Sequence, residues 1–385
     1  MLDERVRFVA ACLEGEFPMS VLCARFGISR KTGYKWLSRY EANRLEGLQD
    51  RSRARHTHAN ATSDAAAAAV IACRTRHDRW GPKKIRQWLI EHDPGRFWPA
   101  ASTIGDLLKR HGLVGPRVRR HRTPLYTQPF ASCTVPNDIW CADFKGWFYT
   151  QDGRRCDPFT LADAQSRFLL RCQVVPHPNR RYVQAVCESA FREYGLPRAI
   201  RTDNGPPFAS PSAGGLSLLS IHWIKLGITP ERIAPSHPEQ NGRLERLHRT
   251  LKEHTANPPQ RNARCQQAAF DRFRHEYNGD RPHEALDQRT PASVYRPSLR
   301  PYPSRVPEMR YPDGYDVRWV GQNGCIRWRG ERIFLSERLR GELVGIGQVD
   351  EEFSNIYFGP ISLAAWDHRR AKLRWPTKRK AKNSR

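Results

Sequence analysis

The sequence predicts a mixed α/β core, preceded by all-α units and followed by a small β domain. Three patterns support this fold class. Apolar residues recur at helical spacing through the first third of the chain. Short apolar strands then alternate with helices in the middle, which is typical of a mixed sheet. Period-two alternation between glycine-bearing turns follows near the C-terminus, and 385 residues leave room for two to four domains.

The composition indicates a polyanion as partner. Lys and Arg total 65 against 39 Asp and Glu, which gives a formal net charge of +26. Such an excess points first to nucleic acid, although a highly charged soluble protein or one of ribosomal type has the same balance. The ten cysteines form no C-x-x-C pair and have no histidines at zinc spacing, so we expect free thiols in a reducing cytoplasm.

The N-terminal sequence carries acidic residues and no long apolar run, so no signal peptide is expected. No stretch approaches the ~18 apolar residues of a membrane span. We therefore expect no membrane partner. The expected location is the bacterial cytoplasm, with nucleoid association when the protein is bound to DNA.

Residues 1–55 are predicted to form a helix-turn-helix unit. A first helix is expected from Leu2 to Gly15, and a second is expected to open with a Ser20 cap. The Ser29 hydroxyl can cap a third helix, Arg30–Tyr40. A helix, a glycine-bearing turn and a capped basic helix are typical of DNA-reading units, although an ordinary helical hairpin with a solvated basic face is the alternative. The candidate DNA contacts are Arg30, Lys31, Lys35 and Arg39.

A second helical DNA-binding unit is expected over residues 60–115, with a purely structural bundle as the alternative. Its expected features are a helix over Ala61–Cys73, a helix with Pro82 in its first turn, and a helix to His111 that Ser102 or Thr103 caps and Gly112 ends. Residues 116–132 are basic, contain proline and follow Gly115, so they are expected to be a linker that can follow phosphates.

Three acidic residues in the predicted core, residues 133–298, are the candidate catalytic and metal-binding groups. Asp143 lies in a strand, Asp203 follows the short strand Ala199–Thr202, and Glu245 lies in the helix Arg243–His254. Carboxylates placed in this way can converge on one point. Mg²⁺ suits the site because it accepts few carboxylates and shares its other positions with water and phosphate. Two such ions would activate an attacking water or hydroxyl and stabilise the leaving oxygen at phosphorus.

Other acids and histidines compete for these roles. Glu239 precedes the Asn-Gly turn, and Glu253 lies about two helical turns beyond Glu245, too far to share its site. Asp163, in a strand beside that of Asp143, is expected to be structural or to lie at the edge of the metal site. We do not expect His237 or His248 to act as a base, because two-metal chemistry needs none.

Two cations lie on the same helical face as Glu245. Arg249 and Lys252 follow it at i+4 and i+7, so both side chains project where a DNA end would lie. A surface ion pair is the alternative for each.

The C-terminal part is predicted to be a small β-barrel of SH3-like type over residues 308–367, which could bind DNA or mediate oligomers. Its expected strands alternate with period two around Tyr315–Val320, Cys325–Trp328 and Arg332–Leu335. Residues 368–385 form a basic tail with no acid, which is expected to lie on phosphates when DNA is present.

The core motifs together resemble one family. They are Trp-x-x-Asp ending at Asp143, Thr202-Asp203-Asn204-Gly205, the segment from Pro238 to Glu245, Lys252, Tyr277 to His283, and Thr290-Pro291. From about residue 130 to 300 the chain resembles DDE-type insertion-sequence transposases with a retroviral integrase-like catalytic core. The resemblance implies a ribonuclease H-like fold, Mg²⁺ or Mn²⁺ as cofactor, and Asp143, Asp203 and Glu245 as catalytic acids. Residues 204–244, 41 in all, separate the last two acids. Because this gap is longer than is usual in the family, we expect an enlarged loop near Ser210–Ser220.

The sequence therefore predicts a polynucleotidyl transferase. It would bind transposon ends, nick a strand with water and join the 3′-hydroxyl to target DNA, as a homo-oligomer because two ends must be coordinated. A metal-dependent nuclease without strand transfer and a DNA-binding regulator with an inactive core are the alternatives. The intact carboxylates argue against the regulator.

Overall fold

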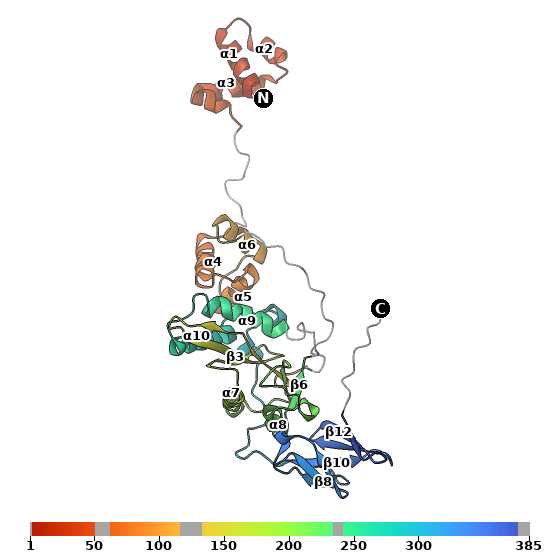
Figure 1. Cartoon of the computed structure of the whole chain (residues 1–385). Coiled ribbons are helices and arrows are strands. Elements are labelled where there is room, and N and C mark those ends of the chain that lie inside the picture. Colours follow the sequence, from red (N-terminus) through yellow and green to blue (C-terminus); the bar gives the residue numbers. More distant parts are fainter. Residues whose placement is uncertain (1, 51–61, 116–132, 234–241, 376–385) are drawn as a thin grey trace. The chain divides into compact units, whose positions relative to one another are not determined.

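The structure, a computed structural model, describes residues 2–50, 62–115, 133–233 and 242–375. The chain divides into two compact units, residues 1–64 and 65–385 (Figure 1). Within the described ranges, no helix has both the length and the apolar character needed to cross a membrane.

The first unit is a three-helix domain. It contains α1 (Leu2–Glu14), α2 (Met19–Arg25), α3 (Arg30–Asn43) and the 3₁₀ turn Arg44–Leu48. The predicted cap of α3 is confirmed, because the Thr32 amide donates to Ser29 Oγ at 3.2 Å. The predicted Ser20 cap is wrong. Ser20 lies inside α2, whose N-cap is the extended residue Pro18, and the Pro18 carbonyl accepts from the first-turn amides.

The second unit begins with three further helices: α4 (Asp64–Arg76), α5 (Pro82–His92) and α6 (Ala101–Arg110). Pro82 occupies the first turn of α5, as predicted. Neither Ser102 nor Thr103 caps α6, so that prediction is wrong: the N-cap is Ala100, and both hydroxyl residues fall within the first turn of the helix. A compact apolar core that includes Val70, Trp80 and Ile104 holds these helices together.

A mixed sheet forms the centre of the second unit. Its strands are β1 (Ile139–Phe144), β2 (Phe148–Tyr149), β3 (Arg155–Asp163), β4 (Leu169–Val175), β5 (Ala199–Thr202) and β6 (Thr229–Arg232). The spatial order is β4-β3-β1-β5-β6, with β2 also paired to β3. The pairs among β1 to β4 are antiparallel, whereas β1, β5 and β6 run parallel. This confirms the predicted mixed α/β core.

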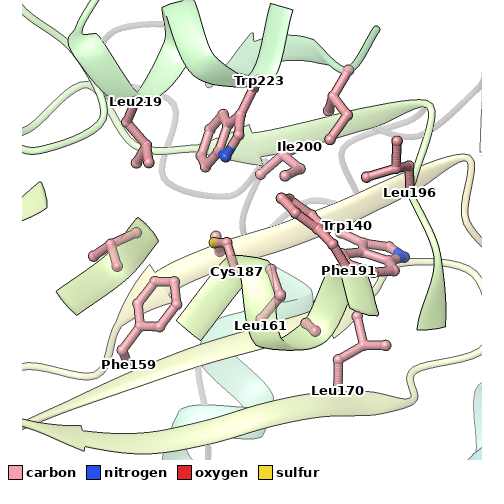
Figure 2. Close-up of a cluster of buried hydrophobic side chains, with 14 of the residues drawn as sticks. Trp140, Phe159, Leu161, Leu170, Cys187, Phe191, Leu196, Ile200, Leu219 and Trp223 are labelled. Carbon is pink, nitrogen blue, oxygen red and sulfur yellow. The ribbon is translucent and has the colours of Figure 1, made fainter. Parts of the chain in front are cut away.

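Helices cover both faces of the sheet. Alternate residues of β1 point to opposite faces. Trp140 and Ala142 pack in one cluster with α7 (Arg180–Tyr194) and α8 (Leu218–Lys225). Figure 2 shows part of this cluster, including Trp140, Phe191 and Trp223. Ile139 and Cys141 pack in another cluster with α9 (Gly242–Thr255) and α10 (Ala263–Gly279), and the short helix α11 (Pro291–Val294) follows.

The C-terminal region is an open sheet, so the predicted closed barrel is not confirmed. Its strands are β7 (Asp316–Trp319), β8 (Cys325–Trp328), β9 (Glu331–Phe334), β10 (Leu343–Gln348), β11 (Phe353–Phe358), β12 (Ile361–Asp367) and β13 (Lys372–Arg374). Five strands pair in the order β13-β12-β11-β10-β7, and β8 and β9 form a separate hairpin. The apolar side chains of this region share a core with Ile221 and Ile224 of α8, which cover apolar surface that a barrel would bury by closing on itself.

Candidate functional site

The first two candidate acids lie at the ends of neighbouring parallel strands. The last paired residues of β1 and β5 are Cys141 and Arg201. Asp143 and Asp203 each follow two positions later, so they occupy equivalent places at the same edge of the sheet. Because side-chain direction repeats every two residues, Asp143 points to the same face as Cys141, which is the face that α9 covers.

The third acid lies on the helix that packs against this face. Buried residues Leu244, Leu247 and Leu251 recur at helical spacing and fix α9 against β1. Glu245, in the first turn of α9, is exposed beside this apolar stripe. The sheet and the helix thus bring the three acids to one region, each from a different element.

The acids influence one another electrostatically. Burial, together with the negative charges of Asp203 and Glu245, raises the pKa of Asp143 to about 7, against the opposing effect of the Phe144 amide that donates to its Oδ1 at 2.8 Å. Burial also raises the pKa of Asp203, while the Gly205 amide, 3.2 Å from Oδ1, acts in the opposite direction. A cation between these groups would remove both the repulsion and the cost of burying charge.

A divalent cation fits this donor set in chemistry, because hard cations take carboxylate oxygens and share their coordination with phosphate. Among the residues that the structure describes, no three His, Cys, Asp or Glu side chains lie close enough together to hold a metal ion.

His248 lies beside this site as a buried residue. It is buried on α9, with Nε2 2.7 Å from Thr160 Oγ1 and Nδ1 4.0 Å from Asp143 Oδ2. Burial and the positive charge of Lys145 lower its pKa to about 3, so the ring is neutral. The available signal in the sequence was its place three residues after Glu245, in line with the buried stripe of α9.

The competing acids have other partners. Asp163 is 1% exposed and accepts hydrogen bonds from the amides of Asn137, Gln165 and Ser166, which is a structural arrangement. Glu253 pairs with Arg79 Nη1 at 3.4 Å. Glu239 and His237 lie outside the described residues.

The candidate DNA-binding residues occupy two places. Arg249 and Lys252 are exposed on α9, on the same side as Glu245. In the first unit, all four candidates lie on α3: Arg30, Lys31 and Lys35 are exposed, and Arg39 is partly exposed. Asn204 has a structural contact, because its amide donates to the Ile233 carbonyl at 2.8 Å and ties the turn after β5 to the end of β6.

Comparisons with known families agree with this architecture. Two family models for an integrase core domain match residues 134–238 and 226–291. A helix-turn-helix domain model matches residues 4–56, and a homeodomain-like domain model matches residues 32–108.

Curated relatives come from insertion elements and retroviruses. The uncharacterized 39.2 kDa protein of insertion element IS476 from Xanthomonas euvesicatoria is 27% identical over 272 residues, which are 70% of this chain and 75% of that protein. The uncharacterized 31.7 kDa protein of insertion element IS407 from Burkholderia multivorans is 27% identical over 188 residues, or 48% of this chain and 65% of the relative, just under two thirds of its length. The Gag-Pol polyprotein of baboon endogenous virus is 39% identical over 69 residues, 18% of this chain and 4% of that protein.

Similar solved structures are integrases. The match to the HTLV-2 integrase catalytic core domain in complex with magnesium covers 42% of this chain and 98% of the integrase chain, with a TM-score of 0.33 and 16% identity. A simian T-cell lymphotropic virus intasome chain covers 76% of this chain and 97% of that one, with a TM-score of 0.36 and 16% identity.

The core-domain matches and the insertion-element relatives define a polynucleotidyl transferase. These matches support a DDE-type insertion-sequence transposase with an integrase-like catalytic core, and models of helix-turn-helix and homeodomain-like domains match its N-terminal region.

Proposed function

We propose that this transposase binds the ends of its element through the N-terminal helices and cleaves and transfers DNA strands with Asp143, Asp203 and Glu245. The observation that carries the proposal is the register of β1 and β5. It places the two aspartates at equivalent strand ends, on the edge where α9 contributes the glutamate. We also propose that the domains have the boundaries that the sequence predicts.

The proposed cofactor is Mg²⁺ or Mn²⁺, with two ions per site. Bound there, the ions would supply charge neutralisation at the reacting phosphate and activation of the attacking oxygen. Asp143, Asp203 and Glu245 would hold them, and the amides of Phe144 and Gly205 keep the two aspartates oriented. The neutral His248, hydrogen-bonded to Thr160, lines one side of the site and adds no charge to it.

The proposed DNA contacts are Arg249 and Lys252 beside the acids, and the basic residues of α3 at the recognition site. Because the long-range field of a chain with net charge +26 attracts any DNA, specificity would come from α3 and not from the charge. We propose a homo-oligomer on DNA, since each element has two ends, and a location in the cytoplasm with nucleoid association.

The test uses a pre-cut element end, Mg²⁺ and a plasmid target. Asp143→Asn, Asp203→Asn and Glu245→Gln should each abolish strand joining yet leave binding of the end intact. Glu253→Gln is the matched control, because Glu253 lies on the same helix but pairs with Arg79. Its activity should remain within a few-fold of wild type.

Each alternative gives a different result. Hydrolysis without a joined product would favour a nuclease that lacks strand transfer. Full activity in all three acid variants would show that these carboxylates are not the catalytic ones. A wild-type protein that binds ends and performs neither reaction would be a DNA-binding regulator.

A further inference from the structure

A cavity of about 380 Å³ lies next to the proposed catalytic region. Its walls come from the turn between β1 and β2, from β3, and from α9 and α10. The residues that matter for its chemistry are Lys145, Trp147, Pro158, Leu251, Lys252 and Phe270. The cavity therefore combines an apolar interior with two ammonium groups, one of which, Lys252, is also a proposed DNA contact.

Trp147 is the most unusual part of this wall, because 55% of this large apolar residue is exposed. The Arg155 guanidinium lies 5.2 Å from the centroid of its ring, and the half-exposed Tyr149 ring lies 5.2 Å away as well. Gly146 has φ +87°, a conformation that favours glycine, and allows the chain to turn immediately before Trp147. The turn at Gly146 thus places the Trp147 side chain at the cavity, and Arg155 and Tyr149 pack against its ring.

Two lysines supply charge at the same cavity. Lys145 follows Asp143 by two residues, and Lys252 lies about two turns beyond Glu245 on α9. Neither forms an ion pair with any acid that the structure describes. An apolar, aromatic-lined hollow with two cations suits a ligand with a flat base and a phosphate, because bases stack on aromatic rings and phosphates bind ammonium groups.

We propose that this cavity holds one unpaired nucleotide of the DNA strand, with its base stacked on Trp147 and its phosphate between Lys145 and Lys252. The proposal rests on the proposed function, since that function brings a DNA strand to the neighbouring acids. Removing a base from the duplex costs pairing and stacking, and the aromatic contact offsets this loss. The cavity would thereby stabilise an opened strand end beside the catalytic acids.

The test measures binding of two DNA probes to the full chain without divalent metal. One is a duplex with a short single-stranded thymidine arm, and the other is the same duplex fully paired. The wild-type protein should prefer the arm, and Trp147→Ala should reduce that preference by roughly 5- to 100-fold, the range of one base–aromatic stack. Tyr182→Ala is the matched control, because Tyr182 is an exposed aromatic residue on α7, which covers the other face of the sheet. It should leave the preference unchanged.

A second readout locates the base. A 5-iodouracil placed in the arm should photocrosslink to Trp147, and an abasic arm should bind wild type and Trp147→Ala equally. An unchanged arm preference in Trp147→Ala, or crosslinks that map away from the cavity, would overturn the proposal even if strand joining is normal. Failure of strand joining together with a Trp147-dependent arm preference would instead refute the proposed function and leave the nucleotide site standing.

Discussion

Asp163 offers a sharp test of the difference between a structural acid and the proposed catalytic acids, because it lies on β3 directly beside β1. Its Oδ1 accepts the Asn137 amide at 2.9 Å, and its Oδ2 accepts the amides of Gln165 and Ser166 at 3.2 and 3.0 Å and the Ser166 hydroxyl at 3.0 Å. The carboxylate therefore joins the segment before β1 to the turn after β3. Asp163→Ala removes all four acceptor contacts at once.

The expected cost follows from burial. Asp163 and Ser166 are at most 1% exposed, so water cannot easily replace the missing acceptor. A buried donor left without a partner costs ~1–3 kcal/mol. The burial of the carboxylate itself, which raises the pKa of Asp163, offsets part of the loss. Because four donor contacts lose their acceptor together, we expect Asp163→Ala to lower the free energy of unfolding of the core by about 3–5 kcal/mol.

The assay is hydrogen exchange of the β1 and β3 amides during a denaturant titration, which reports on the core sheet separately from the N-terminal helices. Asp143→Asn is the comparison: it should abolish strand joining without weakening the core. Asp163→Ala should weaken the core, yet join strands under conditions in which the core remains folded. A stable, inactive Asp163→Ala variant would refute the structural assignment.

Three further outcomes are expected. Ser29→Ala, which removes the cap of α3, should destabilise the first unit by about 1 kcal/mol and weaken DNA binding, as seen by circular dichroism and fluorescence anisotropy. Leu363→Ala creates a cavity in a fully buried position and should cost about 2–5 kcal/mol, with faster hydrogen exchange in the loop around Gly214, whose position lies against Leu363. Burial and the nearby cations Lys84 and Arg281 lower the pKa of His283 to about 3, so His283 is neutral in the fold. The stability that depends on neutral His283 should therefore be fully present above about pH 6.5 and be lost towards pH 3 by up to ~1.4 kcal/mol per pH unit. The loss should be absent in His283→Gln, as measured by comparing the two proteins in denaturation across pH.

Local patterns were enough to predict much of the core. The strand Ala199–Thr202 was predicted with its observed bounds, because an apolar stretch stands between a helix end and the Asp-Asn-Gly turn. Asp143 was predicted to lie in a strand because apolar residues, among them Ile139 and Cys141, alternate along this segment. The α10 helix was missed although Phe270, Phe273 and Tyr277 recur at helical spacing after an Asn262 cap, so that signal was available in the sequence.

Other features depend on contacts between distant segments. The strand β6 contains Pro230, which argues against a strand, and among the described residues it pairs with β5 alone, at the edge of the sheet. The α8 helix has apolar residues on two sides because it packs into two cores, so no single amphipathic face marks it. The spacing along α9 indicates that His248 is buried, but its contact with Thr160 of β3 depends on how the helix packs on the sheet.

The shared core around α8 has a consequence for shortened copies of the gene. Ile221 and Ile224 belong to the segment between the second and third acids, yet they are buried with Val344, Ile356 and Leu363. A frameshift or stop codon after residue 300 would leave an intact set of acids with an uncovered apolar surface. Such a product should aggregate or be degraded before it could compete for DNA ends, so truncation would silence the element and would not create a dominant inhibitor.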